Sequence, residues 1–304
     1  MRPQRLSLAA RLRSNVLHAP PFLLGTAFFG SLALLASLLE GKPPHASKAE
    51  ERSSRKSPEP ESADGTRPKI HGVLQHRLAR RWARASLRAS GSRLQVIGLE
   101  NLPRLTSLNS NKTYAEEGEV LPQGHQLPCV FAGNHTSYMD TPVIFAGLPF
   151  QFRILAKKEL WPIPFIGWYL NRSGQIPIDT ENPRATLSSL SAGVRALRQG
   201  LSVFVFPEGG RTPDGQLQPF LNGASYLAIR AQVPLVPVAL IGVYDLLPIH
   251  TRHFYQAPER RPLKLVIGTP IPTTSMTIRD ADKLTAQLKA SIAALISQHS
   301  LPSR

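Results

Sequence analysis

Residues 129–140 read CVFAGNHTSYMD, an apolar run that gives way at once to glycine and polar side chains. A short apolar run bounded by turn residues is typical of a buried strand. Similar runs stand at residues 94–97, 153–156, 175–178, 202–206, 235–241 and 263–267, and helical patterns stand at residues 183–199, 223–231 and 280–298. This alternation predicts an α/β domain with a central, mostly parallel or mixed sheet flanked by helices.

The chain has 304 residues, which suits one domain of ordinary size and an N-terminal extension. Residues 22–39 carry no charge and reach the lower limit for crossing a hydrocarbon core of about 30 Å as a helix. We therefore predict a basic leader and membrane anchor over residues 1–40 that spans or re-enters the bilayer. A cleaved signal peptide is the alternative, because Arg2, Arg5, Arg11 and Arg13 precede the apolar run.

Residues 41–70 are rich in Pro, Ser, Lys and Glu without apolar periodicity, so we expect a disordered linker before a folded domain at 71–304. Residues 71–90 have the pattern of a basic amphipathic helix. Its predicted apolar stripe is Leu74, Leu78, Trp82 and Ala85, surrounded by Arg77, Arg80, Arg81, Arg84 and Arg88. The stripe would either rest on anionic headgroups or pack on the domain while the arginines stay solvated.

Lys and Arg total 36 against 20 Asp and Glu, a net charge of +16. Nucleic acid, an anionic membrane surface and a phosphorylated substrate are the candidate partners. Residues 1–94 hold 17 of these cations against 6 anions, so +11 lies beside the apolar segment, which favours a membrane. Cys129 is the one cysteine, which excludes intrachain disulfides and multi-cysteine metal sites, and its apolar run predicts an inert buried thiol.

His135 and Asp140 lie directly after the predicted strand 129–132, where sites in α/β sheets gather. Five residues of continuous helix would turn them by about 140° from each other, so they can meet only across a turn. If Asp140 lies in the first turn of a following helix, its carboxylate can fix one ring nitrogen of His135. The other nitrogen would then take a proton from a hydroxyl. The alternative is that Asp140 caps its helix and His135 is an ordinary loop histidine. A metal site is disfavoured, because no third ligand stands at a recognisable spacing.

Residues 206–212, FPEGGRT, follow a second predicted strand. Gly209 and Gly210 would let the backbone approach a ligand, and Arg211 could grip a phosphate with two hydrogen bonds. Glu208 would orient Arg211 or a substrate hydroxyl. Alternatively, Glu208 and Arg211 pair with each other in a simple turn.

These two segments resemble the paired signatures of the glycerolipid acyltransferase family, in particular the 1-acyl-sn-glycerol-3-phosphate acyltransferases. The similarity runs from residue 96 to about 272. Residues 157–169, KKELWPIPFIGWY, and 174–179, GQIPID, resemble the second block of the family, which helps to bind the acceptor. Residues 233–238, VPLVPV, resemble the fourth block, which belongs to the acyl-binding region.

The resemblance implies a His135–Asp140 dyad that acts on the free hydroxyl of 1-acyl-glycerol 3-phosphate (lysophosphatidic acid), giving phosphatidic acid, with acyl-CoA or acyl carrier protein as the thioester donor. It implies no cofactor, no metal, and a place on the inner or plasma membrane with the catalytic domain on the cytoplasmic side. Arg211 with Lys157 or Lys158 would hold the acceptor phosphate. The substrate-binding residues that it implies are Asn134, Lys157, Lys158, Gly167, Glu208, Gly209, Gly210 and Arg211.

Three positions depart from the pattern of the family, because Gly210, Thr180 and Leu221 stand where Thr, Arg and Lys are common. Two lost cations leave other acceptors open, such as glycerol 3-phosphate, another lysophospholipid or a lyso-aminolipid. A basic membrane-binding protein without catalysis is the alternative of another class. A nucleic-acid partner is disfavoured, since no aromatic platform is interleaved with the arginines.

Overall fold

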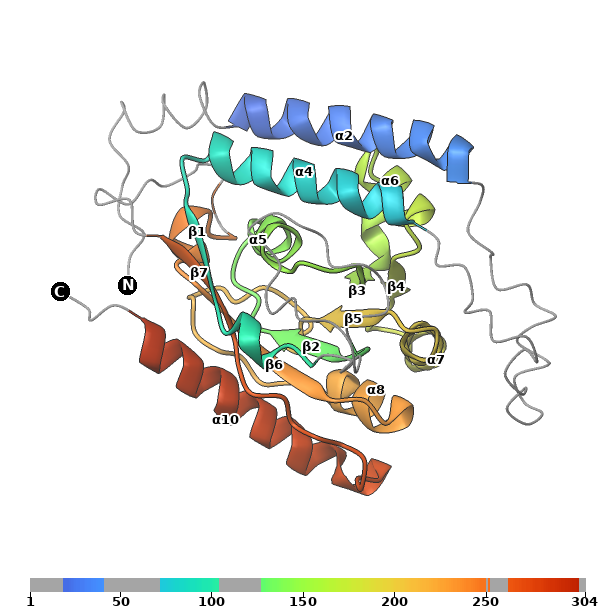
Figure 1. Cartoon of the computed structure of the whole chain (residues 1–304), viewed down its shortest axis with the longest axis vertical. Coiled ribbons are helices and arrows are strands. Elements are labelled where there is room, and N and C mark those ends of the chain that lie inside the picture. Colours follow the sequence, from blue (N-terminus) through green and yellow to red (C-terminus); the bar gives the residue numbers. More distant parts are fainter. Residues whose placement is uncertain (1–18, 41–71, 104–126, 250, 252–261, 301–304) are drawn as a thin grey trace, which may run out of the picture.

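The computed structural model describes residues 19–40, 72–103, 127–249, 251 and 262–300. Its centre is a seven-stranded sheet in the order β1-β7-β6-β2-β5-β3-β4 (Figure 1). Strands β6, β2, β5, β3 and β4 run in one direction, β7 runs antiparallel to β6, and β1 runs parallel to β7. The sheet is therefore mixed and mostly parallel, which confirms the predicted fold class.

All seven predicted strands are present within two residues of their predicted ends. They are β1 (Leu94–Ile97), β2 (Val130–Gly133), β3 (Phe152–Lys157), β4 (Ile176–Ile178), β5 (Ser202–Val205), β6 (Leu235–Ile241) and β7 (Leu263–Ile267). The longer helices are α2 (Ala19–Glu40), α4 (Val73–Ala89), α5 (Asp140–Gly147), α6 (Ile166–Arg172), α7 (Pro183–Arg198), α8 (Gly223–Ala231) and α10 (Ala281–His299). A short helix, α9 (Val243–Leu246), and three single turns of 3-10 helix complete the described elements.

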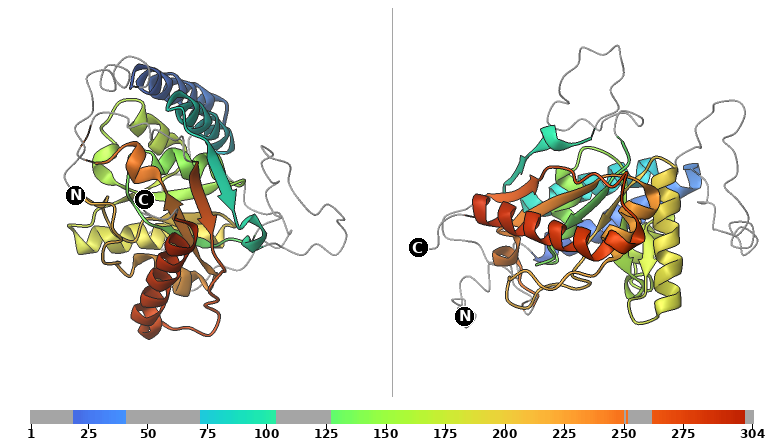
Figure 2. Two further views of the ribbon diagram at one scale, coloured as in Figure 1. Left: turned by 90° about the vertical axis from the view of Figure 1, so that its left-hand side faces the viewer. Right: turned by 90° about the horizontal axis from the view of Figure 1, so that it is seen from below.

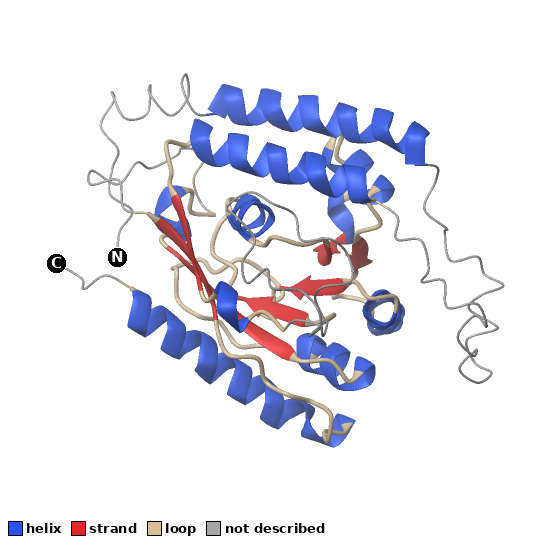
Figure 3. Ribbon diagram, viewed as in Figure 1, coloured by secondary structure: helices blue, strands red, loops and turns tan. Residues whose placement is uncertain are grey.

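Helices cover both faces of the sheet, so each face has an apolar core of its own (Figure 3). Helices α4 and α5 line one core, and α7, α8 and α10 line the other. Strand β2 serves both, because Phe131 points into the first core while Val130 and Ala132 point into the second. Burial on both faces explains why the strands read as continuous apolar runs instead of alternating ones.

Helix α2 lies alongside α4 on the outer side of the first core (Figures 1 and 2). The Nε1 atom of Trp82 donates to the hydroxyl of Thr26 at 3.1 Å, and the Trp82 ring packs on Phe22 with the centroids 6.2 Å apart. Gly30 lies so close to Phe165, just before α6, that any Cβ there would collide with the Phe165 backbone. By length and composition, α2 is the one helix among the described residues that could cross a membrane.

The helix predicted over residues 71–90 is α4, but its buried face differs from the predicted stripe. The buried residues are Gln75, His76, Ala79, Arg80, Ala83, Ser86 and Leu87, which lie one position, about 100°, around the helix from the stripe. Ala85 is exposed, and Arg80, expected in solvent, is only 4% exposed; burial lowers its pKa to about 10. The buried face differs from the predicted stripe because α4 has two partners, the domain on one face and α2 on another.

Two predictions fall outside the described residues: the basic leader up to residue 18 and the linker at 41–70.

Candidate active site

The candidate site lies at the carboxyl ends of three neighbouring parallel strands. Strands β2 and β5 pair side by side, with Ala132 opposite Val205, and β3 is the next strand beyond β5. The segment 134–140 leaves β2, the segment 206–212 leaves β5, and Lys157 ends β3. Because these strands share one direction, segments far apart in the sequence meet at one edge of the sheet.

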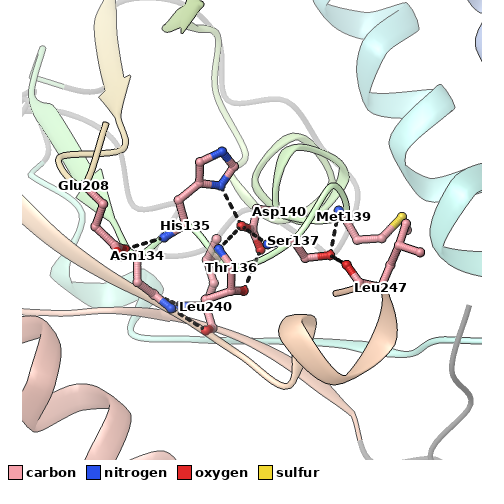
Figure 4. A network of polar contacts seen from close by, with 9 residues as sticks. All are labelled: Asn134, His135, Thr136, Ser137, Met139, Asp140, Glu208, Leu240 and Leu247. Atoms are coloured by element: carbon pink, nitrogen blue, oxygen red, sulfur yellow. Dashed lines mark hydrogen bonds and ion pairs between the residues drawn. The ribbon is translucent and has the colours of Figure 1, made fainter. Parts of the chain in front are cut away.

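His135 and Asp140 face each other across a turn, as predicted. His135 Nδ1 lies 2.8 Å from Asp140 Oδ2 (Figure 4). Asp140 is the first residue of α5 and is fully buried. Its Oδ2 also accepts hydrogen bonds from the backbone N–H groups of Thr136 and Ser137, at 2.5 and 2.8 Å. One carboxylate therefore shapes the turn and orients the imidazole at the same time.

The His135 ring is held on its face as well as at its edge. It stacks on Phe206, the residue that follows β5, with the ring centroids 4.0 Å apart and the planes 16° from parallel. The side chain is 19% exposed. Figure 4 shows the second ring nitrogen turned away from Asp140, and no hydrogen bond to Nε2 is recorded among the residues that the structure describes. That nitrogen is thus open to a bound ligand.

The backbone of His135 joins the two segments. Its N–H donates to Glu208 Oε1 at 2.7 Å, and its carbonyl accepts from the N–H of Thr212 at 2.8 Å. Glu208 Oε2 accepts from the N–H of Gln218 at 2.9 Å. Burial raises the pKa of the Glu208 carboxyl, although these amide donors partly offset that effect. The Glu208 carboxylate therefore connects segment 134–140 with the loop that contains Gln218.

Glu208 does not pair with Arg211 in the described structure, so it does not orient Arg211 by direct contact, and its predicted contact with a substrate hydroxyl stays a prediction. The alternative of a simple Glu208–Arg211 turn is wrong for the same reason. The guanidinium of Arg211 instead lies over the ring of Tyr138, with Cζ 3.7 Å from the ring centroid. Tyr138 belongs to segment 134–140, which we call the histidine segment. This contact is therefore a further link between the histidine segment and segment 206–212.

Residues around the dyad are fixed to the end of β6 and to the residue that follows α9. The side-chain amide of Asn134 donates to the carbonyl of Leu240 at 2.9 Å and accepts from its N–H at 2.8 Å. The Ser137 hydroxyl donates to the carbonyl of Leu247 at 2.7 Å (Figure 4). The structure thus gives Asn134 a role in holding the loop, and its contact with substrate stays a prediction.

The two predicted lysines differ in their surroundings. Lys158 forms an ion pair with Asp179 at 2.5 Å, which raises the pKa of the lysine and lowers that of the carboxyl. Lys157, at the end of β3, is exposed, and no ion pair is recorded for it among the described residues. Of the two lysines, Lys157 is therefore the one whose charge is not already paired with a carboxylate of the described residues.

The three glycines predicted to bind substrate differ in backbone conformation and surroundings. Gly209 has φ +70°, a left-handed conformation that suits glycine, and Gly210 faces open space. Gly167 packs in α6, where a Cβ would fall onto the carbonyl oxygen of Trp161. Gly167 thus has a packing role, and the space beside Gly210 is where a ligand could approach.

Comparison with known proteins places the chain in a family. A family model described as Acyltransferase matches residues 93–241. Human 1-acyl-sn-glycerol-3-phosphate acyltransferase alpha is 30% identical over 209 residues, which cover 66% of this chain and 71% of the human protein. The chain belongs to the acyltransferase family.

Further relatives carry the same activity in their names. Chloroplastic 1-acyl-sn-glycerol-3-phosphate acyltransferase BAT2 from Brassica napus is 32% identical over 185 residues, 61% of this chain and 46% of the plant protein. The chain therefore spans about half the length of some curated relatives. The crystal structure of the 1-acyl-sn-glycerophosphate acyltransferase PlsC from Thermotoga maritima has a TM-score of 0.64 at 20% identity. The structural alignment covers 97% of this chain and 100% of PlsC, so the two proteins share the fold.

Two further features of the described residues bear on the chemistry of the site, the lone cysteine and the grouping of possible metal ligands. Cys129 is buried, and burial raises the pKa of its thiol to about 12, so a nucleophilic thiolate is disfavoured. No group of three or more His, Cys, Asp or Glu side chains that could hold a metal occurs among the described residues. Phe206 and Ser137, which position the dyad, were not predicted, because their sequence neighbours give no sign of which ring or carbonyl they contact.

Proposed function

We propose that this chain transfers a fatty acyl group from an acyl-CoA or acyl carrier protein thioester to the free hydroxyl of 1-acyl-glycerol 3-phosphate, giving phosphatidic acid. The observation that carries the proposal is the dyad. The His135 imidazole is bonded at Nδ1 to a buried carboxylate, stacked on Phe206, and open at Nε2. This is the arrangement that a general base needs.

In the proposed reaction, one proton passes from the acceptor hydroxyl to His135 and then to the leaving thiolate. Nε2 of His135 takes the proton from the acceptor hydroxyl as its oxygen attacks the thioester carbonyl. The C–S bond then breaks, and the thiolate leaves with the proton from His135. The buried Asp140 carboxylate stabilises the imidazolium that forms between these two steps. A positioned base of this kind contributes roughly 10²- to 10⁴-fold in rate, and no covalent acyl-enzyme is required.

Arg211 and Lys157 are the proposed ligands of the acceptor phosphate. Arg211 lies in the segment joined to His135 through Thr212, so a phosphate bound there stays near the base. Guanidinium donors match phosphate oxygens in pairs, whereas an ammonium acts as a point charge. Lys157 adds the second charge, since Lys158 is neutralised by Asp179. Glu208, Gly209, Gly210 and Asn134 complete the proposed site as the frame around it.

The membrane is the proposed location, because the acceptor and the product are both lipids. Apolar side chains on the outer side of α2 are each more than half exposed: Leu23, Leu24, Phe28 and Leu35. Helix α2 lies along α4, whose Arg77, Arg81 and Arg88 are exposed, so it would enter the bilayer surface lengthwise beside cations that suit anionic headgroups. We propose that the catalytic domain faces the cytoplasm, where soluble thioester donors would reach it.

Expression in a host that lacks its own 1-acylglycerol-3-phosphate acyltransferase tests the proposal. We expect growth and phosphatidic acid to be restored, and membranes from these cells to acylate lysophosphatidic acid. Thr180 and Leu221 are neutral where cations are common, and Leu221 is exposed, so other acceptors belong in the same assay. If lysophosphatidic acid stays unacylated while glycerol 3-phosphate or another lysophospholipid is consumed, the substrate assignment is wrong.

A further inference from the structure

The histidine segment presents two side chains outward. In residues 134–140, Asn134, Thr136, Ser137, Met139 and Asp140 are buried, His135 is partly exposed, and Tyr138 is 46% exposed. The neighbours of Tyr138 are fixed: the Ser137 hydroxyl bonds to the Leu247 carbonyl and accepts from the N–H of Met139. The Tyr138 ring is therefore held by a rigid turn, although it is not part of the core.

Arg211 covers the face of this ring. Its Cζ lies 3.7 Å from the ring centroid, well within the range of a cation–π contact. Its neighbour Thr212 is fully buried and donates to the His135 carbonyl, so the backbone beside Arg211 is fixed as well. No hydrogen bond or ion pair of the Arg211 guanidinium is recorded among the residues that the structure describes.

A guanidinium stacked by its face keeps all its N–H groups free at its edge. Those donors lie in the plane of the group, and paired N–H groups match two oxygens of a phosphate. An aromatic face also restrains a long side chain that would otherwise lose entropy on binding. We propose that Tyr138 is a positioning residue for the acceptor phosphate, which it serves by holding the Arg211 guanidinium flat with its donors toward the ligand. This inference rests on the proposed function.

Substitutions at position 138 test the inference. Tyr138→Leu removes the ring, and we expect KM for lysophosphatidic acid to rise roughly two- to fivefold, with smaller changes in kcat and in KM for the acyl donor. Tyr138→Phe keeps the ring face and should restore the acceptor KM. Leu187→Ala, an exposed apolar position on α7 outside both segments, controls for loss of surface area.

Fluorinated phenylalanines at position 138 separate ring electrostatics from shape. Fluorine withdraws electron density from the ring face but changes its size little, so the acceptor KM should climb with each added fluorine. The inference would be overturned if the acceptor KM stayed constant across the fluorinated series or stayed unchanged in Tyr138→Leu. It would also be overturned if Tyr138→Phe raised the acceptor KM as much as Tyr138→Leu does.

Equilibrium binding of lysophosphatidic acid to the His135→Ala protein in detergent micelles gives a readout that needs no turnover. Introducing Tyr138→Leu into that protein should weaken binding by the same factor, and Tyr138→Phe should not. If the native chain binds the lipid with this dependence but transfers no acyl group, the proposed function fails while the role of Tyr138 stands. If neither variant changes binding, the role of Tyr138 is refuted even in an active enzyme.

Discussion

Replacing Asp140 with asparagine should remove catalysis while leaving the fold in place. Oδ2 of Asp140 accepts from His135 Nδ1 and from the N–H groups of Thr136 and Ser137, and Oδ1 accepts from the Thr136 hydroxyl at 3.2 Å. In Asp140→Asn, the amide oxygen can keep the three contacts of Oδ2. The new amide N–H can donate to the Thr136 hydroxyl, which also accepts hydrogen bonds. Only the negative charge beside the imidazole is lost.

The expected kinetic loss is large, because that charge stabilises the imidazolium formed when His135 takes a proton. We expect kcat to fall roughly 10²- to 10⁴-fold, about 3–5 kcal/mol in activation free energy, with little change in the acceptor KM. The free energy of unfolding should change by only about 1 kcal/mol. Asp140→Ala is the contrasting variant, since it orphans two buried amides and should cost roughly 2–6 kcal/mol of stability.

Phosphatidic acid formation in mixed micelles and thermal unfolding followed by circular dichroism measure these two effects separately. The reasoning is refuted if Asp140→Asn turns over within threefold of the native protein. It is also refuted if Asp140→Asn unfolds as readily as Asp140→Ala, because the carboxylate would then act through folding alone.

Lys157→Ala should raise KM for lysophosphatidic acid severalfold, whereas Lys158→Ala should have a smaller effect because Asp179 already neutralises that charge; equal effects would contradict the assignment. Gly209→Ala places a Cβ at φ +70° and should destabilise the loop by about 1–2 kcal/mol, visible as a lower unfolding temperature. Acid should destabilise the chain through His76, whose pKa burial lowers to about 3. The unfolded state takes up this proton near pH 6.5 and the folded state near pH 3, so stability falls as the pH drops through that window. The loss is about 2 kcal/mol between pH 7 and pH 5, and it should disappear in His76→Leu when urea unfolding is compared at the two pH values.

The strands and the meeting of the two segments could be predicted from the sequence. Parallel strands buried on both faces leave continuous apolar runs, and polar residues directly after such runs mark one edge of the sheet. His135 and Asp140 could then be assigned to a turn, because a helix would point them apart. The predicted turn and the helix α5 that follows it are both present.

Contacts between distant elements could not be predicted in the same way. The pattern of α4 shows two faces with small or apolar residues, but not that α2 packs on one of them. The pattern therefore predicts Arg80 in solvent, although the structure buries it. The partners of Glu208 are backbone amides, which every residue carries and no motif marks. The stacking of Arg211 on Tyr138 depends on loop geometry that spacing does not encode.

The central claim is that His135 moves the proton of the acceptor hydroxyl. Its most direct test follows thiol release and phosphatidic acid together, using purified native and His135→Ala proteins with lysophosphatidic acid and acyl-CoA in vesicles. The account predicts one thiol per phosphatidic acid with the native chain, and neither product above background with His135→Ala, while both proteins bind the vesicles equally. Phosphatidic acid formed by His135→Ala at the native rate would contradict it.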